Sequence, residues 1–306
     1  MRTLFVGAGA TGGYFGGLLA EAGRDVTFLV RPRRGATLAE RGLRILSPGD
    51  ERVIPVRTVT ADALDGPYDL IVLAVKSYGL EQAVADIGPA AGPETVIVPL
   101  LNGMRHIDTL VDTFGAERVY GGVCMIAGTL TEEGDVVRLT GLQRLAYGPL
   151  DGGGGDRLAA VTEALSGAGF ESQPSAQIVH EMWEKWVFLA SLGVVTTLMR
   201  ATVADITAAP GGVTFAGAVA EEAIAVASAA GHPPRESAQA FLRTSITARD
   251  VPMTSSMYRD MVAGAPVEAD AIVGDLVAFA ERHGVAVPLI SAAWTNLSIY
   301  SDNRAA

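Results

Sequence analysis

The sequence contains little cysteine, little positive charge and few histidines. Cys124 is the only cysteine among 306 residues, so an internal disulfide is excluded and a reducing compartment is expected. The 34 acidic residues outnumber the 23 basic ones and leave a net charge of −11. Nucleic acid and anionic membranes are therefore disfavoured as partners, because both attract proteins with a basic field. The four histidines show no metal-binding spacing, and no metal site is predicted.

Long apolar runs and a targeting segment are also missing. No uncharged apolar run reaches the ~18 residues of a membrane span. The N-terminus enters a strand-like run at 3–6 without the long apolar core and small-residue cleavage site of a signal peptide. A cytoplasmic protein is therefore predicted. With 49% apolar and 19% charged residues, the chain has the composition of a globular protein, and its length allows two domains.

The first half of the chain alternates short apolar runs with helical patterns. Apolar runs that are typical of strands buried on both faces occupy 3–6, 25–30, 69–75 and 95–101. Helical patterns lie between them at 10–22, 80–87 and 104–113. This alternation predicts a parallel α/β sheet. A hairpin at 43–56, around a Pro-Gly-Asp turn, and a β-rich segment at 119–149 are predicted in addition.

The second half is rich in alanine and has helical spacing without a convincing strand. Helices are predicted at 176–209, 212–230, 235–248, 266–283 and 288–300. The predicted fold class is therefore α/β, with an N-terminal doubly wound domain of the Rossmann type followed by an all-helical C-terminal domain. We place the first domain at 1–172 and the second at 173–306, and we expect the active site in the cleft between them.

A glycine-rich segment directly follows the first predicted strand and opens the first helix. Gly7, Gly9 and Gly12 have the G-x-G-x-x-G spacing. In this context the first glycine permits a tight turn, the second lets the backbone approach a pyrophosphate, and the third allows close packing of helix and strand. The sequence therefore predicts a dinucleotide-binding loop made of Gly7, Ala8, Gly9, Ala10, Thr11 and Gly12.

The end of the second predicted strand indicates which dinucleotide binds. An NAD site would carry Asp or Glu there, about 20 residues after the glycines. The chain instead has Arg31, with Arg33 and Arg34 beyond it, while Asp25 lies at the other end of the strand. Guanidinium groups suit the 2′-phosphate of NADP. NADP is therefore the predicted cofactor, and the alternative is that these arginines form only a solvated basic turn.

Two more polar residues follow strands at the edge where open α/β sheets bind ligands. Lys76 comes after the apolar run at 69–75, and Asn102 comes after the run at 95–101. Both are candidates for contact with a bound ligand. Helix capping or turn formation is the alternative for each of them.

Lys185 lies between two tryptophans at the start of an apolar helical segment. No further charge follows until Arg200. Helical spacing puts Lys185 on one stripe with Met182, Trp186 and Leu189, where a side chain facing the core would be expected. The ammonium group could simply extend to solvent along an apolar stem. The other interpretation is a functional lysine.

These motifs together resemble the ketopantoate reductase (2-dehydropantoate 2-reductase) family over essentially the whole chain. Members have the glycine loop, an arginine after the second strand, a later lysine, an N-G-M segment, a W-x-K helix and an S-S-M segment followed by a glutamate. The matching residues occur in the same order: Gly7–Gly12, Arg31, Lys76, Asn102-Gly103-Met104, Trp183-Glu184-Lys185, Ser255-Ser256-Met257 and Glu268.

The resemblance implies NADPH-dependent reduction of a 2-oxo acid, typically 2-dehydropantoate to (R)-pantoate in pantothenate and coenzyme A biosynthesis. It implies that Lys185 is the general acid, which protonates the oxygen where hydride addition builds negative charge. Ser256 and Glu268 would bind substrate together with Lys185. Lys76, Asn102 and Ala127 would contact the nicotinamide half of the cofactor.

Simpler roles remain open for two of these residues. Glu268 follows Pro266 in the first turn of a predicted helix, where acidic residues are favoured by the helix dipole alone. Ser256 could be only an N-cap residue of the next helix.

The sequence departs from the family at two positions on the helix of Lys185. Well-studied members have asparagines four and eight residues after the lysine, whereas this chain has Leu189 and Gly193, with Thr196 and Thr197 beyond them. A related reductase acting on a different 2-oxo acid therefore remains an alternative. So does a non-catalytic NADP(H)-binding module, which would have no need for Lys185. The sequence does not fix the oligomeric state and leaves a homodimer open.

Overall fold

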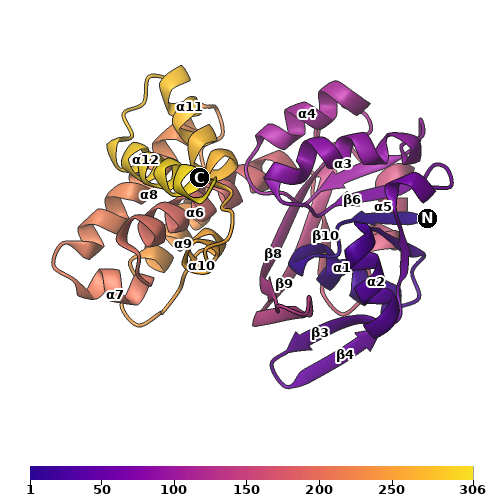
Figure 1. Cartoon of the computed structure of the whole chain (residues 1–306). Coiled ribbons are helices and arrows are strands. Elements are labelled where there is room, and N and C mark those ends of the chain that lie inside the picture. The colour runs from indigo at the N-terminus through magenta and orange to yellow at the C-terminus, as the bar shows by residue number, and fades with distance from the viewer. Residues whose placement is uncertain (306) are drawn as a thin grey trace. The chain divides into compact units, whose positions relative to one another are not determined.

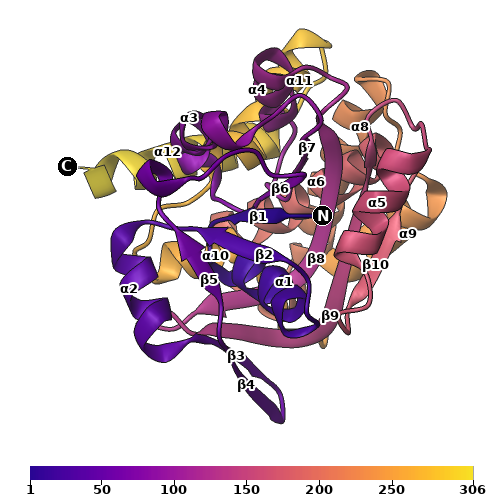
Figure 2. The same cartoon turned by 90° about the vertical axis from the view of Figure 1, so that its right-hand side faces the viewer.

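In the computed structural model, which describes residues 1–305, five short strands form a parallel sheet. Their order is β5-β2-β1-β6-β7, with β1 (Thr3–Val6), β2 (Val26–Leu29), β5 (Arg57–Val59), β6 (Leu70–Leu73) and β7 (Val96–Pro99). Figure 2 shows β1 between β2 and β6. All residues of β1, β6 and β7 are buried, which explains their uninterrupted apolar sequences. The carboxyl ends of these strands lie at one edge of the sheet.

A second sheet contains the predicted hairpin and the β-rich segment. The hairpin is β3 (Leu43–Ser47) with β4 (Asp50–Ile54), and the β-rich segment is β8 (Tyr120–Leu130) with β9 (Val136–Pro149). The order β10-β9-β3-β4 joins these elements through parallel pairs of β9 with β3 and with β10 (Glu171–Pro174), and β8 pairs with β9. Figure 2 shows the β3–β4 hairpin reaching away from the first sheet.

Helix α1 (Ala10–Glu21) packs against both sheets, and its glycines make this possible. A Cβ at Gly16 would lie 2.7 Å from the ring of Phe28 in the first sheet. A Cβ at Gly17 would lie 2.6 Å from Leu43 in the second sheet. Every residue from Gly12 to Leu19 is buried. Larger side chains at these positions would push the helix away from one sheet or the other.

The remaining elements of this half are helices and short turns. They are α2 (Pro32–Arg41), α3 (Leu80–Ile87), α4 (Arg105–Phe114) and α5 (Asp156–Leu165), with the 3₁₀ turns η1 (Ala61–Ala63), η2 (Ser77–Gly79) and η3 (Gly88–Ala90). The helix α5 was not predicted, because its sequence follows four consecutive glycines that are typical of a linker.

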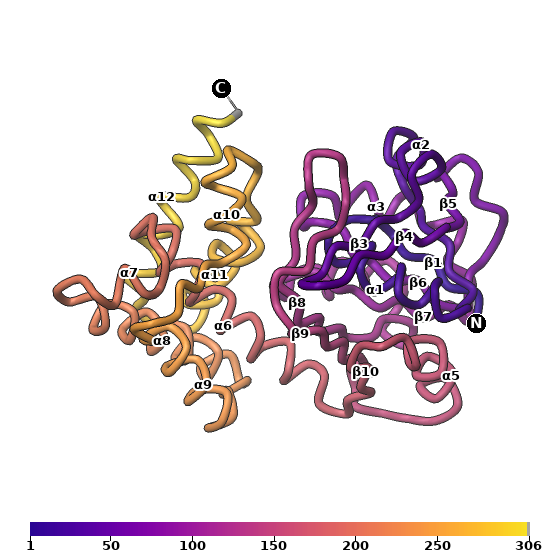
Figure 3. Tube along the Cα trace, turned by 90° about the horizontal axis from the view of Figure 1, so that it is seen from below, coloured from indigo at the N-terminus to yellow at the C-terminus, as the bar shows by residue number. Residues whose placement is uncertain are grey.

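The second half is helical from α6 onward. It comprises α6 (Ile178–Met199), α7 (Val203–Ala208), α8 (Gly212–Ala229), α9 (Glu236–Ile246), α10 (Ser256–Val262), the π-helical turn η4 (Asp270–Gly274), α11 (Asp275–Arg282) and α12 (Pro288–Ala305). Figure 3 shows α12 beside α10, where Tyr300 Oη donates to the carbonyl oxygens of Met261 and Ala265. The predicted fold class is confirmed, a Rossmann-like α/β domain followed by a helical region.

Two predicted helices are interrupted or irregular in the structure. The helix predicted at 176–209 is divided into α6 and α7, because Thr202 and Asp205 form a capping box that starts a new helix. The helix predicted at 266–283 begins as the π turn η4 before it becomes α11. The carbonyl of Ile272 in this turn accepts a hydrogen bond from the indole of Trp186, 2.9 Å away.

Helix α8 is long and apolar enough to cross a membrane by length and composition. It packs within the helical region, against α7, α9, α11 and α12. Ala216, Val219, Ala220 and Ala223 are fully buried on it. Its apolar character is therefore that of a core helix.

The chain forms two compact units, which Figure 1 shows as strand-containing and helical parts. The first unit contains residues 1–101 and 106–179, and the second contains residues 102–105 and the chain from His180 onward. The short segment Asn102–Arg105 therefore belongs to the helical unit, although it directly follows the strand region that ends at Leu101. This placement brings Asn102 to the residues of the second half.

Candidate active site

The glycine loop has the geometry that its spacing predicts for a dinucleotide site. Gly7 has a φ of +96°, which forms the tight turn after β1. A Cβ at Gly9 would meet no atom within 4 Å, so the backbone there is open to a ligand. A Cβ at Gly12 would lie 2.1 Å from the carbonyl oxygen of Gly7, so only glycine fits. Gly9 precedes the first residue of α1, and the free N–H groups of that helix end suit a phosphate.

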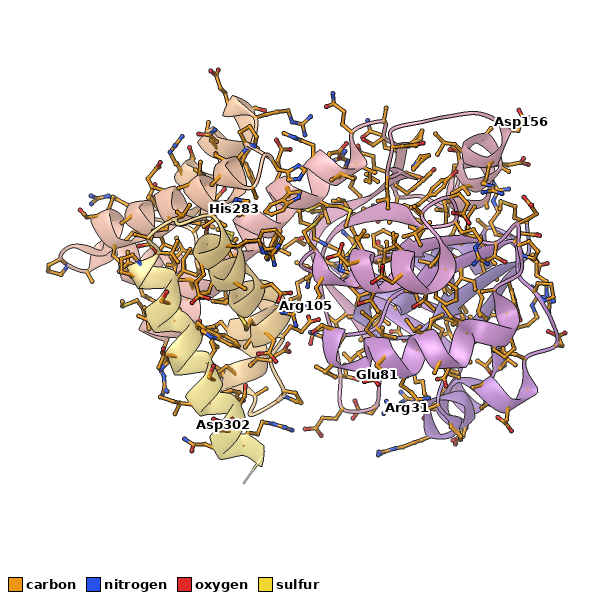
Figure 4. The ribbon with its side chains drawn as sticks, turned by 90° about the horizontal axis from the view of Figure 1, so that it is seen from above. Arg31, Glu81, Arg105, Asp156, His283 and Asp302 are labelled. Carbon is orange, nitrogen blue, oxygen red and sulfur yellow. The ribbon has the colours of Figure 1, made fainter. Side chains whose placement is uncertain are left out.

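Arg31 lies at the end of β2 as predicted and is available to a ligand. It is the N-cap residue of α2, it is exposed, and Figure 4 labels it at this position. Within the part of the chain that the structure describes, its side chain makes no hydrogen bond or ion pair. The geometry is therefore compatible with contact to an adenosine 2′-phosphate.

Arg34 contacts the glycine loop, although it was identified beforehand only as part of a basic segment. Its Nε and Nη2 atoms donate to the carbonyl oxygen of Ala8 inside the glycine loop, at 3.2 and 2.9 Å. Burial lowers the pKa of Arg34 below its usual range, although the carboxylate of Asp135 opposes this shift. The run of arginines identified a basic segment, but which arginine bends back onto the loop depends on the start of α2 and could not be read from spacing.

Lys76 and Ala127 lie on segments that contact the glycine loop. Lys76 follows β6 and immediately precedes η2, without forming a side-chain cap there. Ala74, two residues earlier, is the residue against which Gly7 and Gly12 pack. Ala127 lies at an irregularity in the β8–β9 pairing, and a Cβ on the adjacent Gly128 would be 3.7 Å from Ala10. β-Bulges of this kind are frequent beside active sites.

Asn102 and Glu268 lie together in the helical unit. Asn102 Nδ2 donates to Glu268 Oε2 at 3.5 Å, which is a long hydrogen bond. The Glu268 side chain is only 5% exposed. Gly103 has a φ of +82°, and a Cβ there would lie 2.3 Å from the carbonyl oxygen of Ala271 in η4. The segment after Asn102 therefore packs tightly on the turn that follows Glu268.

An ion pair further fixes this segment. Arg105, labelled in Figure 4, pairs with the buried carboxylate of Asp275 at the start of α11. Arg105 begins α4 and Asp275 follows η4 directly. Together with the Gly103 contact, the pair holds the Asn102 segment against the elements that carry Glu268.

Lys185 lies partly buried on α6, whose neighbouring tryptophans are buried. Trp183 is 3% exposed and Trp186 is 1% exposed. The Trp186 indole binds the Ile272 carbonyl, and the Ile272 amide donates to the carbonyl oxygen of Glu268 at 3.1 Å. The backbone segments of Lys185 and Glu268 are therefore linked through one hydrogen-bonded chain. Trp186 was predicted only as a core residue, and this link depends on the π turn.

Ser256 is not the N-cap of α10, which leaves its hydroxyl available. The N-cap is Ser255, whose Oγ accepts from the amide of Tyr258 at 2.9 Å. Ser255 Oγ also pairs with Thr196 Oγ1 of α6 at 2.9 Å. Ser256 is the first helical residue, and among the described residues its hydroxyl has no hydrogen-bond partner. The capping alternative considered for Ser256 is therefore wrong.

The helix of Lys185 presents no amide groups at the two positions where it departs from the family. Leu189 is partly buried on α6. Gly193 is covered by the side chain of Met257, since a Cβ at Gly193 would lie 2.6 Å from the Met257 methyl carbon. The hydroxyl of Thr197, one turn further, donates a hydrogen bond to the backbone carbonyl of Gly193 in the same helix. This face of α6 beyond Lys185 is therefore apolar.

The residues of the helical unit form a coherent set for acid-assisted chemistry on a small anion. An ammonium group, a buried carboxylate, an amide and a free hydroxyl are supplied by Lys185, Glu268, Asn102 and Ser256. The first unit independently contains the glycine loop, whose geometry suits a phosphate, with Arg31, Lys76 and Ala127 on neighbouring segments. A dinucleotide fits this loop because Gly9 leaves open space above the helix end.

Comparison with known sequences identifies the family. A family described as "Ketopantoate reductase PanE/ApbA" matches residues 3–152, and its C-terminal counterpart matches residues 177–301. The chain is 34% identical over 304 residues to the "Uncharacterized oxidoreductase YkpB" of Bacillus subtilis, covering 99% of this chain and 100% of that protein. It is 30% identical over 292 residues to the 2-dehydropantoate 2-reductase of Halobacterium salinarum, covering 95% of each.

Solved structures share the fold along the whole chain. A structure described as D-mandelate dehydrogenase with NADH and anilino(oxo)acetate has a TM-score of 0.88 at 23% identity and covers 100% of both chains. A ketopantoate reductase from Staphylococcus aureus, described as dimeric, has a TM-score of 0.81 at 19% identity and covers 99% of this chain and 100% of its own. The chain is thus an oxidoreductase of the ketopantoate reductase PanE/ApbA family, which uses a nicotinamide cofactor.

Proposed function

We propose that the chain catalyses the NADPH-dependent reduction of a 2-oxo acid, with Lys185 as general acid and 2-dehydropantoate as the substrate, giving (R)-pantoate. The observation that carries this proposal is the convergence of three separate segments in the helical unit. Asn102 contacts Glu268, and Trp186, the residue after Lys185, binds the turn that follows Glu268. These are the segments in which the family has its catalytic and substrate-binding residues.

The use of lysine in this chain also supports Lys185 as the proton donor. Of 23 basic residues only two are lysines, Lys76 and Lys185. Arginine remains protonated at any working pH and cannot serve as a general acid, whereas an ammonium group can. Both lysines of this arginine-rich chain lie at proposed site positions, and Lys185 is the one on the helix expected to supply the proton.

Each residue then has a defined task. The nicotinamide, when bound, supplies the hydride for C2 of the oxo acid. Lys185 holds a proton at the C2 oxygen, where negative charge develops. Glu268 and Ser256 bind the substrate, and Asn102 orients Glu268 through its amide. Arg31 would bind the 2′-phosphate of NADPH, and Lys76 and Ala127 would contact its nicotinamide half.

A panel of 2-oxo acids tests this proposal through the loss of NADPH absorbance. The panel contains 2-dehydropantoate, 3-methyl-2-oxobutanoate and phenylglyoxylate, which differ in the hydroxyl group and in bulk. We expect turnover of 2-dehydropantoate and a strong loss of it in Lys185→Met. Failure of every 2-oxo acid with both NADPH and NADH would refute the proposal.

A second candidate function is reduction of a 2-oxo acid with an apolar substituent. It is favoured by the Leu189 side chain and by the Met257 methyl group that covers Gly193, because neither can hydrogen-bond a substrate hydroxyl. The likeness to D-mandelate dehydrogenase, a protein described with NADH and anilino(oxo)acetate, agrees with this candidate. Turnover of phenylglyoxylate without turnover of 2-dehydropantoate would establish it in place of the first.

We further propose that the enzyme acts in the cytoplasm, as a homodimer, on a small-molecule substrate. Sedimentation or light scattering of the purified protein gives the oligomeric state directly. A monomer at working concentration would contradict the dimer.

A further inference from the structure

The substrate residues proposed above carry no net charge. Lys185 contributes one positive charge, Glu268 contributes one negative charge, and Ser256 and Asn102 are neutral. A 2-oxo acid brings a permanent carboxylate beside its carbonyl group, while Lys185 is required at the carbonyl oxygen. The buried charge of Glu268 repels a second carboxylate, and repulsion is strong away from water. A second cation near these residues would offset this repulsion and stabilise the substrate carboxylate.

Arg259 lies one helical turn after Ser256 on α10 and shares a face with it. Met257, on the other side of this helix, points toward α6 and covers Gly193. Since residues three apart are neighbours on a helix surface, Ser256 and Arg259 lie side by side, away from Met257. The hydrogen bond between Ser255 and Thr196 further fixes α10 on the helix that carries Lys185.

Arg259 is partly buried but is not neutralised by any carboxylate in contact with it. Its Nη1 atom donates to the carbonyl oxygen of Thr254 at 3.0 Å and to Thr254 Oγ1 at 3.3 Å. No carboxylate lies within salt-bridge distance of it anywhere in residues 1–305. Burial lowers the pKa of Arg259, more than the charge of the adjacent Asp260 raises it.

Other arginines of the helical unit behave differently. Arg243 of α9 makes two hydrogen bonds to the carboxylate of Glu221, at 2.6 and 3.0 Å. Arg235 forms an ion pair with Glu184. Taking an unpaired guanidinium out of water is costly unless an anion compensates for it. The free donors of Arg259, Nε and Nη2, have the fork geometry that binds a carboxylate.

We propose that Arg259 binds the carboxylate of the 2-oxo acid, with Ser256 beside it and Lys185 left for the carbonyl oxygen. This inference rests on the proposed function and adds a substrate-binding residue to it. It also implies that the enzyme requires an ionised acid and discriminates against neutral esters and amides of the same 2-oxo compound.

The test compares an acid with its neutral ester in three proteins. The substrates are the best 2-oxo acid of the panel and its methyl ester, and the proteins are the unaltered enzyme, Arg259→Gln and Arg259→Lys. Loss of a charge-assisted hydrogen-bonding partner should reduce kcat/KM for the acid by about ten- to a hundred-fold in Arg259→Gln. The ester should be turned over equally by the unaltered enzyme and by Arg259→Gln. Arg259→Lys should recover part of the preference for the acid, because it restores the charge without the fork.

Arg243→Gln serves as the matched control, because it removes an exposed arginine that already has a carboxylate partner. It should leave both substrates unaffected. An equal fall for acid and ester in Arg259→Gln would indicate a purely structural role and overturn the proposal, as would no fall for the acid.

A binding measurement separates this inference from the proposed function. Calorimetry with oxamate, an unreactive 2-oxo acid analogue, is done on full-length protein saturated with NADPH. Oxamate binding that Arg259→Gln weakens by at least about ten-fold supports the role of Arg259. Binding that is unchanged in Arg259→Gln overturns that role alone. If the unaltered protein neither binds oxamate nor reduces any 2-oxo acid, the proposed function fails and this inference fails with it.

Discussion

Alanine at Gly12 should destabilise the first unit, whereas alanine at Gly9 should leave it folded and unable to bind the cofactor. A Cβ at Gly12 would lie 2.1 Å from the carbonyl oxygen of Gly7 and 2.8 Å from the Cβ of Ala74. Both are rigidly held atoms, and the separation from Gly7 is more than an ångström below an ordinary contact. Helix α1 would therefore have to move away from β1 and β6.

The cost of this movement can be estimated from the packing of α1. Forcing one extra carbon into a well-packed region costs about 1–3 kcal/mol and occasionally more. The upper part of this range applies, because α1 lies between two sheets and cannot retreat from one without pressing on the other. For a domain of about 150–250 residues, each 1 kcal/mol lowers Tm by roughly 2–4 °C. We expect Gly12→Ala to lose about 6–12 °C or more.

Gly9→Ala is the matched control with the same added methyl group. Gly9 has a φ of −85° and a ψ of −165°, which alanine adopts freely, and no atom lies within 4 Å of its Cβ position. Its Tm should therefore change little, while the methyl group occupies the space that a pyrophosphate needs. Thermal unfolding and calorimetric titration with NADPH measure the two effects. Unimpaired NADPH binding by Gly9→Ala, or an unchanged Tm in Gly12→Ala, would show that this account of the loop is wrong.

Three further predictions concern other parts of the molecule. Arg31→Ala should weaken NADPH binding in fluorescence titrations by about ten- to a hundred-fold, because the 2′-phosphate loses its guanidinium partner, and should leave NADH binding almost unchanged. Equal affinity of the unaltered protein for NADPH and NADH would contradict this role of Arg31. Trp186→Phe leaves the buried carbonyl of Ile272 without its hydrogen-bond donor, so the free energy of unfolding measured by urea titration should fall by about 1–3 kcal/mol and KM for the oxo acid should rise. If neither value changes, the indole does not hold the Glu268 segment in place. Burial, assisted by the charge of His180, lowers the pKa of His232 below its usual 6.5. The stability that His232 contributes is therefore fully present above pH 6.5 and is lost as the pH falls from 6.5 through the lowered pKa. His232→Phe, which keeps a ring against Trp183, should show a smaller fall of Tm on acidification, and an identical fall would exclude His232 as its source.

The strands and the glycine loop could be predicted because the interactions that determine them are reflected in residues close together in the sequence. The runs that became β1, β6 and β7 are apolar throughout, since both faces of each strand are covered. The spacing of Gly7, Gly9 and Gly12 encodes a turn, an open backbone and a close contact, and each of these is present. Information of this kind lies within a few residues of sequence.

The contacts between distant segments could not be predicted in the same way. Arg34 binds Ala8, Asn102 contacts Glu268 across 166 positions, and the π turn η4 is fixed by the indole of Trp186. A helical pattern at 266–283 does not reveal a π turn, because one extra residue in a turn barely changes the apolar periodicity. The glycine loop and Arg31 were predicted from the residues themselves, and Ser256, Glu268 and Ala127 from the family resemblance, whereas the contacts among these segments required the tertiary structure.

The most direct test of the central claim is single-turnover oxidation of NADPH by Lys185→Met and Lys185→Arg on the substrate that the panel identifies. General acid catalysis contributes roughly 10²–10⁴-fold. We expect hydride transfer to slow by about that factor in both variants, with NADPH affinity nearly unchanged, because Lys185→Arg keeps the charge but cannot release a proton. Near-normal turnover in Lys185→Met would contradict the account and leave Lys185 as a side chain that only extends its charge to solvent.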